Sequence, residues 1–365
     1  MAASVNYVWN FAKATQIEAL KRRDARIIAD KKSGELIAVP NFLSSYELNN
    51  LSSGSSRELG LHSQTVQAVC EEYVRRRKQF GKLLRWRGKR SLGWIPFKKV
   101  GIQIHGDGVI YAKQKFRFWK SRELPRDAVI RTGCFTQDRR GRWYVSITFV
   151  SEELAGQFKA LRAGEPKEVG VDLGIKVLAT TSEGEKIERP DLRARHLAKL
   201  RRLEKQRRFA RRSQSRQKKF AALPKERQLR NLHAKVANQR KDDLHKKSTK
   251  LVRSSGVIIV GDLRCALMNR SRSLSGISLD SGIGMFRKML RYKSERDGVV
   301  YKEVSERNST QTCSGCGWQH PQDARIGLGV REWVCPCCEA RHDRDSNAAK
   351  NILRMGHHAL IHSAA

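Results

Sequence analysis

The chain has 365 residues, 39% of them hydrophobic, which is enough for two or three domains with buried cores. Lysine and arginine (74) outnumber aspartate and glutamate (36), so the formal net charge is +38. This excess argues against an ordinary enzyme of small molecules. It favours a polyanion as partner over a merely solvated basic surface, because neutralised phosphates release counterions.

No apolar run in the sequence approaches the ~20 residues that a membrane span requires. The start, MAASVNYVWN, lacks the apolar core of a signal peptide. We therefore expect an intracellular, cytoplasmic protein without a membrane partner.

The first 90 residues are predicted to be mostly helical. NYVWNFAKATQIEALKRR has apolar residues at three- and four-residue spacing, and SQTVQAVCEEYVRRRKQF is amphipathic, with Ser63 as a possible N-cap. The Ser/Asn/Gly-rich stretch between them predicts turns. Residues 91–150 are rich in β-branched and aromatic residues separated by glycine-containing turns, which predicts a small antiparallel sheet or barrel.

The pattern changes again from about Val169. VGVDLGIKVLATTSEGEKI predicts two strands, and a basic helical region follows, with 21 Lys+Arg against 4 Asp+Glu between Lys199 and Arg253. A charge run is usually a solvated face, but one this one-sided would repel itself without a polyanion. The strand VIIVGDL, a helix around GIGMFRKMLRYKSERDG, the strand VVYKEV and a helix at SNAAKNILRM then predict an α/β domain with some parallel pairing.

Five of the eight cysteines lie close together and suggest a metal site. CSGC and CPCC form two C-x2-C pairs with 18 residues between them, which is the spacing of a zinc ribbon. Four thiolates suit structural Zn²⁺ and leave no open position for catalysis. The predicted ligands are Cys313, Cys316, Cys335 and Cys338, with Cys337 as a spare and His320 and His342 as possible substitutes.

Two aspartates are candidates for a second metal site. Asp172 lies in the apolar strand VGVDLG, where a carboxylate is costly unless it is paired or binds a metal. Asp345 precedes an alanine-rich helix, where it could also be a simple N-cap. A strand aspartate and a helix aspartate can converge on one sheet edge. With a third carboxylate they would hold two Mg²⁺ ions for phosphodiester hydrolysis.

GVDLGIKVLATTS, IIVGDL and NSTQTCSGCG…CPCCEARHDRDSNAAKNIL together resemble the C-terminal half of the TnpB family, over roughly residues 165–355. These are transposon-encoded proteins related to type V CRISPR effectors. VNYVWN and GRWYVSI resemble the N-terminal half more weakly, and we expect the opening strand of its barrel to be shortened. The resemblance implies a multidomain α/β plus β-barrel fold. Its parts are a helical recognition-like region at 1–90, a wedge-like β-barrel at 91–164, an RNase H-like RuvC nuclease domain at 165–306 with a basic helical insert at about 190–255, a zinc ribbon that binds target nucleic acid at 307–342, and a RuvC-like helix and tail at 343–365.

The resemblance also implies RNA-guided, Mg²⁺-dependent cleavage of double-stranded DNA by a two-metal mechanism, with base pairing to the guide RNA giving sequence specificity. It maps Asp172 onto the first family carboxylate and Asp345 onto the last. We expect one monomer per guide RNA, in the prokaryotic cytoplasm and on the nucleoid when DNA is bound. The main alternative is a cleavage-deficient RNA-guided DNA-binding repressor; a zinc-ribbon RNA-binding protein and a strict transposase are others.

The second family carboxylate is missing from its usual place. The family pattern ends this strand with Glu-Asp-Leu, with the glutamate catalytic, whereas this chain has Gly261 there. Asp262 is one step on and would face the other side of the strand. Glu303 and Glu306 lie between that strand and the zinc ribbon, where some TnpB-like relatives have a relocated glutamate. We predict that Glu306 is the third carboxylate, with Asp262 and Glu303 as alternatives, and that Gly261 leaves space for it.

Overall fold

The computed structural model describes residues 1–21, 25–29, 36–121, 123–160, 167–212, 216–263, 280–327 and 329–364. The chain divides into two compact units, Met1–Glu152 and Glu153–Ala365. None of the helices in the described ranges is both long enough and apolar enough to span a membrane.

The first unit begins with helices, as predicted, but also contains a short β-hairpin that the sequence pattern did not predict. Trp9 and Tyr73 pack edge to face with ring centroids 5.0 Å apart and join the first and fourth helices. The predicted N-cap at Ser63 is wrong by one residue, because His62 Nδ1 accepts the hydrogen bond from the Gln64 amide. In chain order these elements are α1 (Ala2–Lys21), β1 (Ala25–Ala29), β2 (Leu36–Pro40), α2 (Ser45–Leu51), α3 (Ser55–Glu58) and α4 (Ser63–Phe80).

Two three-stranded antiparallel sheets, β3-β7-β8 and β4-β5-β6, complete the first unit. The ring of Phe135 joins them, since its centroid lies 5.4 Å from Phe97 in its own sheet and 5.6 and 5.8 Å from Tyr111 and Phe116 in the other. The strands are β3 (Trp94–Lys98), β4 (Ile102–His105), β5 (Gly108–Tyr111), β6 (Gln114–Arg117), β7 (Val129–Gln137) and β8 (Trp143–Val150), with the 3-10 turn η1 (Lys99–Gly101) after β3.

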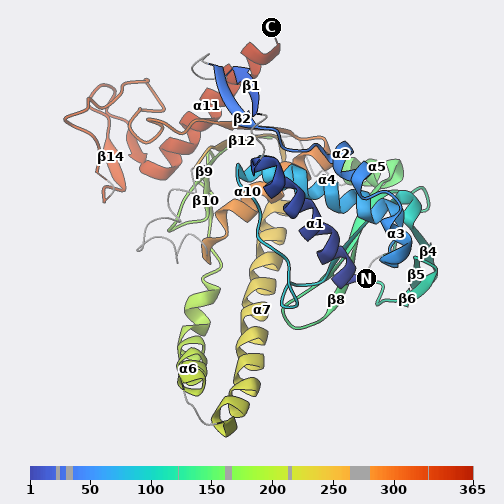
Figure 1. Ribbon diagram of the computed structural model, residues 1–365. Helices are drawn as coiled ribbons and strands as arrows, with labels where there is room; N and C mark the ends of the chain where they lie inside the picture. The colour runs from blue at the N-terminus through green and yellow to red at the C-terminus, as the bar shows by residue number, and fades with distance from the viewer. Residues whose placement is uncertain are drawn as a thin grey trace. The chain divides into compact units, whose positions relative to one another are not determined.

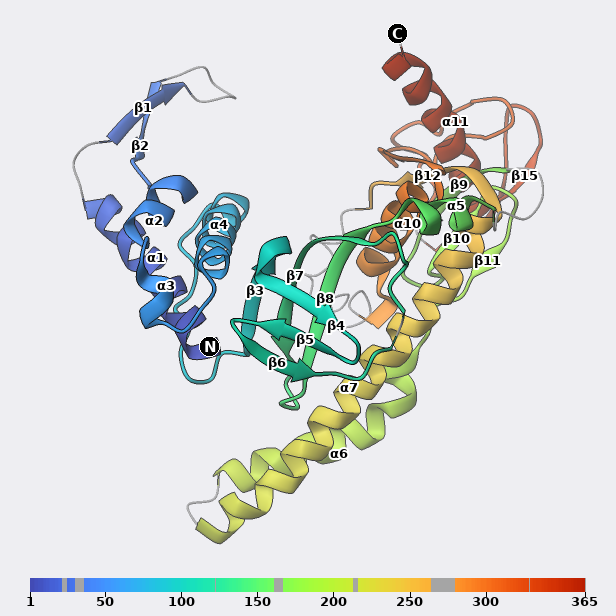
Figure 2. The same ribbon diagram turned by 90° about the vertical axis from the view of Figure 1, so that its right-hand side faces the viewer.

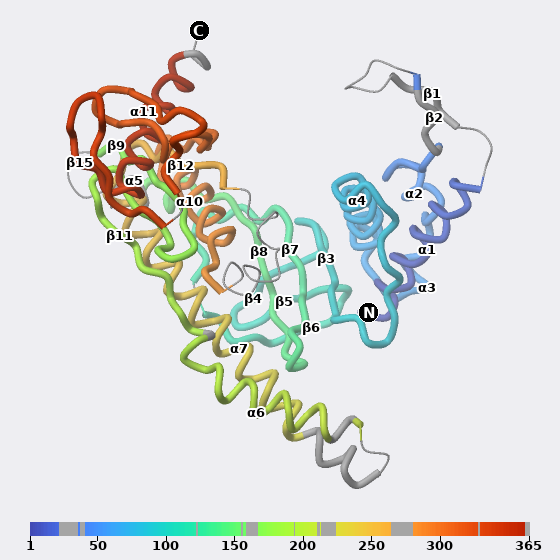
Figure 3. Tube along the Cα trace, turned by 90° about the vertical axis from the view of Figure 1, so that its left-hand side faces the viewer, coloured from blue at the N-terminus to red at the C-terminus, as the bar shows by residue number. Residues whose placement is uncertain are grey.

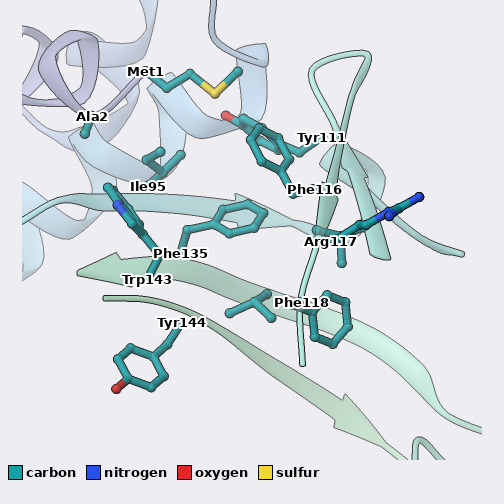
Figure 4. Close-up of a pocket in the computed structure, with 12 residues that line it drawn as sticks. Met1, Ala2, Ile95, Tyr111, Phe116, Arg117, Phe118, Phe135, Trp143 and Tyr144 are labelled. Carbon is teal, nitrogen blue, oxygen red and sulfur yellow. The ribbon is translucent and has the colours of Figure 1, made fainter. Parts of the chain in front are cut away.

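An apolar cavity of about 390 Å³ lies beside these sheets. Figure 4 shows Phe135 in the middle of the lining residues, with Trp143 on one side, Phe116 and Phe118 on the other, and Met1 above them. Its wall is almost entirely apolar or aromatic, so the cavity belongs to the hydrophobic core of the first unit.

The second unit is built on a five-stranded sheet with the order β11-β10-β9-β12-β13. The strands β9, β12 and β13 run parallel, and β10 is antiparallel to both of its neighbours. The mixed α/β organisation predicted from the sequence is therefore confirmed. The strands are β9 (Lys167–Leu173), β10 (Ala179–Thr181), β11 (Lys186–Ile187), β12 (Ser255–Gly261) and β13 (Val300–Val304).

Helices cover both faces of this sheet (Figures 1 and 3). On one face Val171 and Ile258 pack in a core with Leu244 of α7 and Phe286 of α10. On the other face α11 approaches closely, since a Cβ atom at Gly170 would lie 2.1 Å from the carbonyl oxygen of Ala349. The helices are α5 (Glu152–Ala160), α6 (Leu192–Arg212), α7 (Arg216–Arg253), α10 (Ile283–Asp297) and α11 (Arg344–Ala364).

The basic stretch between the sheet strands folds into a long helical hairpin. α6 and α7 lie side by side and extend away from the sheet (Figures 1 and 2). Their contact is a small leucine cluster, whereas most of the lysine and arginine side chains described there face outward. The cluster consists of Leu200, Leu203, Leu229 and Leu232.

Candidate functional site

The four predicted zinc ligands lie together between β13 and α11, with the short strands β14 (Glu332–Val334) and β15 (Arg341–Asp343) beside them. Their sulfur atoms all lie within 4.8 Å of one another, and this is the only such group of three or more histidine, cysteine or acidic residues in the described residues. The Cys313–Cys338 and Cys316–Cys335 sulfur distances are 3.7 and 3.6 Å. A tetrahedron with Zn–S bonds of about 2.3 Å has edges of about 3.8 Å, so the group fits Zn²⁺.

The histidines proposed as substitutes are not members of this cysteine group in the described residues: His342 contacts one of its sulfurs, and His320 contacts two tryptophans. His342 Nε2 lies 3.0 Å from Cys313 Sγ, and its ring stacks on Trp333. His320 packs between Trp318 and Trp333, with ring centroids 4.5 and 4.9 Å away. Cys337 is exposed and lies outside the group.

The three predicted carboxylates line one cavity of about 760 Å³. Asp172 is near the carboxyl end of β9, Glu306 lies two residues beyond β13, and Asp345 is in the first turn of α11. Segments distant in sequence thus meet where the parallel strands end. The carboxylate oxygens of these three residues do not all lie within 4.8 Å of one another in the described part of the chain. They are therefore more widely spaced than the four cysteine sulfurs.

Glu306 occupies the space that a side chain at position 261 would need. A Cβ atom at Gly261 would lie 3.2 Å from Glu306 Oε2 and 3.3 Å from Glu306 Cβ. It would also lie 3.1 Å from Ile352 Cδ1. The glycine therefore lets the glutamate of the following loop fold over the end of β12.

The two alternative carboxylates have other partners and do not line the cavity. Asp262 Oδ1 accepts a hydrogen bond from the Glu306 amide at 3.3 Å, so Asp262 holds the loop that carries Glu306. Glu303 Oε1 accepts from Arg291 at 2.6 Å and from the Tyr301 hydroxyl at 2.7 Å. The geometry therefore favours Glu306 among the three.

Burial and like charge dominate the electrostatics of the cavity. Burial, and then the nearby charges of Glu306 and Asp345, raise the pKa of Asp172 to about 8, although Arg344 opposes this. Burial also raises the pKa of Glu306, and the charge of Asp262 adds to the effect. Burial is therefore the main reason that the pKa of both carboxyl groups is raised. Four basic residues also line the cavity, namely Lys176, Arg189, Arg331 and Arg344.

Asp345 is not the N-cap of its helix. The cap is Asp343, whose Oδ1 accepts from the Ser346 amide at 2.9 Å and whose other oxygen pairs with Lys186. Both carboxylate oxygens of Asp345 instead lie 3.2 Å from Arg331. Sequence reasoning missed Arg331, because it lies in an irregular segment with no pattern to place it. It also missed two asparagines in α11, Asn347 and Asn351, although their four-residue spacing on a buried helix face was a usable signal.

The sequence matches two family models in this unit. Residues 160–272 match a model described as "Probable transposase", and residues 284–352 match "Cas12f1-like, TNB domain". A Streptomyces pristinaespiralis protein named "Putative RNA-guided DNA endonuclease" is 36% identical over 241 residues, which are 65% of this chain and 55% of that protein. Escherichia coli InsQ, with the same description, is 26% identical over 98% of this chain and 88% of its own length.

The chain is similar to the TnpB family over these residues. The family resemblance inferred from the motifs is therefore confirmed. Among solved structures, the Cas12f1 chain of a complex with single-guide RNA and target DNA has a TM-score of 0.56. That match covers 96% of this chain and 80% of Cas12f1 at 14% identity, and it shows a shared fold.

Proposed function

We propose that this chain is an RNA-guided, Mg²⁺-dependent DNA endonuclease with Asp172, Glu306 and Asp345 as its catalytic carboxylates. The observation that carries the proposal is their convergence on one cavity from three elements. The names of the relatives and the fold shared with Cas12f1 support guide RNA and double-stranded DNA as partners.

The arrangement of strands supports an RNase H-like RuvC domain for the second unit. Asp172 lies on the central strand β9, between an antiparallel edge and two parallel strands. The antiparallel sheets of the first unit likewise support a wedge-like β-barrel after a helical recognition region. We retain the domain boundaries given above as part of this proposal, with Zn²⁺ in a structural role in the ribbon.

The donor set of the cavity fits Mg²⁺, which prefers carboxylate oxygens. Burial is the main cause of the raised pKa of Asp172, and a bound cation would favour the ionised form of this carboxyl group. When bound, two Mg²⁺ ions would activate a water nucleophile and stabilise the leaving oxygen. Asp172 would release its proton to bind metal, Glu306 would bind as the carboxylate, and Asp345 would exchange its contact with Arg331 for metal. The basic hairpin would hold phosphates of the guide or heteroduplex.

The test uses the protein purified with its co-purifying RNA and a guide-matched DNA target flanked by randomised sequence. We expect cleavage in Mg²⁺ and none in EDTA. Asp172→Asn and Glu306→Gln should each lower the cleavage rate at least a hundredfold without changing target affinity. Each variant removes one ionisable oxygen but keeps the shape of the side chain.

Glu303→Gln is the matched control, since it makes the same chemical change at a glutamate bound to Arg291 and remote from the cavity. It should cleave at a rate within threefold of the wild type. Guided DNA binding without any cut in Mg²⁺ would refute the nuclease and favour the repressor, which no observation above supports. A fully active Glu306→Gln variant would refute the assignment of that residue.

A further inference from the structure

Two buried asparagines of α11 have no role in the mechanism proposed above. Asn347 and Asn351 lie one turn apart on the same helix face, and their exposed fractions are 1% and 2%. Asparagine is unfavourable inside helices, and a buried amide is costly unless it is hydrogen-bonded. We therefore expect both buried side-chain amides to have hydrogen-bond partners.

Both side-chain amides bind the same stretch of backbone. Asn351 Nδ2 donates to the carbonyl oxygens of Ser309 and Thr312 at 2.9 and 2.6 Å. Asn347 Nδ2 donates to the same two oxygens at 3.4 and 2.7 Å. Asn347 Oδ1 also accepts from the Ser314 amide at 2.8 Å. We call Asn347 and Asn351 the amide pair.

The stretch that the amide pair binds connects the two candidate metal centres. Its start is tied to Glu306, whose carbonyl accepts from the Ser309 amide at 3.1 Å. Its end is the first cysteine pair, because Ser314 directly follows Cys313. Asp345 lies in the first turn of the helix that supplies the amide pair, two residues before Asn347.

We propose that the amide pair consists of positioning residues that hold the Glu306 loop in register with α11, so that the folded ribbon sets the spacing between Glu306 and Asp345. This rests on the proposed function of those carboxylates. Only an amide supplies two donors and one acceptor in this volume. Leucine has a similar size and removes all three, so Asn351→Leu breaks that residue's two bonds to the loop and its bond from Arg354 without emptying the space.

The experiment compares Asn351→Leu with the wild type, both purified with their RNA. We expect one zinc per chain in both proteins and a guide-RNA Kd within twofold. Binding of Mn²⁺, used as a spectroscopic probe of the carboxylate site by electron paramagnetic resonance, should weaken at least fivefold. Cleavage at 1 mM Mg²⁺ should fall at least tenfold and recover in part at 20 mM, because excess metal offsets the misplaced ligand.

His358→Leu is the control, since it makes a similar change at an exposed site of the same helix. It should match the wild type in all four measurements. Loss of zinc from Asn351→Leu would overturn the inference, because the amides would then serve the ribbon alone. Unchanged Mn²⁺ affinity with intact zinc would overturn it as well.

If Asn351→Leu does not fold, Asn347→Leu is a second variant that tests the same proposal. It breaks three bonds to the same stretch and leaves both carbonyls bonded to Asn351, so it is judged by the same criteria and by the same expected weakening of Mn²⁺ binding of at least fivefold. A wild-type protein that binds Mn²⁺ but never cuts DNA would refute the proposed function. The Mn²⁺ affinities would still decide whether the amide pair positions the carboxylates.

Discussion

At the scale of single residues, Glu306 occupies the space beside Gly261 in which the family pattern has a glutamate, which supports the proposed relocation of the third carboxylate. The glutamate reaches the end of β12 from a loop that β13 delivers, and the glycine provides the room. Asp262 then fixes the loop through the Glu306 amide. In the proposed site, Gly261, Asp262 and Glu306 would together replace the single glutamate of the family pattern.

The proposed relocation predicts what happens when the glutamate is moved from position 306 back to position 261. Glu306→Ala should lower cleavage at least a hundredfold, and adding Gly261→Glu should restore at least a tenth of the wild-type rate. The new side chain would project into the space that the deleted one vacates. Gly261→Glu alone should be poorly active, because the two glutamates would compete for that space. Single-turnover cleavage rates at saturating Mg²⁺ measure all three, and a double variant no faster than Glu306→Ala would contradict the arrangement.

At the scale of elements, a buried lysine joins α10 to α7. Lys293 Nζ donates to the His245 carbonyl and to the Ser248 and Thr249 hydroxyls, each at 2.7 Å. Burial, assisted by nearby arginines, lowers the pKa of this lysine from 10.5 to about 8. All three acceptors are neutral. The contact therefore joins the two helices but makes the charged form of Lys293 less favourable than it is in water.

This lowered pKa predicts a pH dependence. Between about pH 8 and 10.5 the unfolded chain keeps the Lys293 proton and the folded chain releases it, so this group makes stability rise with pH. The free energy of unfolding of the wild type should rise relative to Lys293→Met by up to about 1.4 kcal/mol per pH unit. Urea unfolding from pH 8 to 10 measures this, and parallel pH profiles would contradict it.

In the zinc ribbon, the neighbouring residues Cys337 and Cys338 are predicted to differ in their importance for metal binding. Cys338→Ser should lose the metal and destabilise the ribbon, because the remaining ligands cannot close the tetrahedron. Cys337→Ser, one residue away and outside the cysteine group, should keep one zinc per chain. Metal content by mass spectrometry and thermal melting compare the two. Equal zinc loss would mean that both sulfurs bind.

The sequence predicted those elements whose pattern is local. The apolar run before Gly261 predicted β12, and paired cysteine spacing predicted the metal group, because both signals lie within a few residues. The hairpin β1–β2 was missed because its strands are short and flanked by charged residues. The ion pair of Arg331 with Asp345 was also missed, since it depends on tertiary packing of a segment without regular structure.

At the scale of the whole molecule, the net charge of +38 is the dominant property. Arg201, Lys205 and Arg208 are exposed and follow one face of α6 at helical spacing. If this face binds RNA phosphates, changing all three to glutamine should lower the slope of log K against log salt by about 2 in magnitude. Filter binding from 50 to 400 mM salt measures it, with Gln206→Ala as the control. An unchanged slope would place RNA elsewhere.

Because β9 pairs with segments far away in the sequence, the parts of the candidate site are made at different times during translation. Asp172 precedes Asp345 by 173 positions. The strands β12 and β13 lie between the two aspartates in the chain, and α11 contains Asp345. At a translation rate of about 5–20 residues per second, roughly 10–35 s pass between the appearance of the two aspartates. A nascent chain can fold its basic hairpin and attract RNA during that interval. If the proposed carboxylates act together, the chain cannot cut DNA until the segment that carries Asp345 has been made.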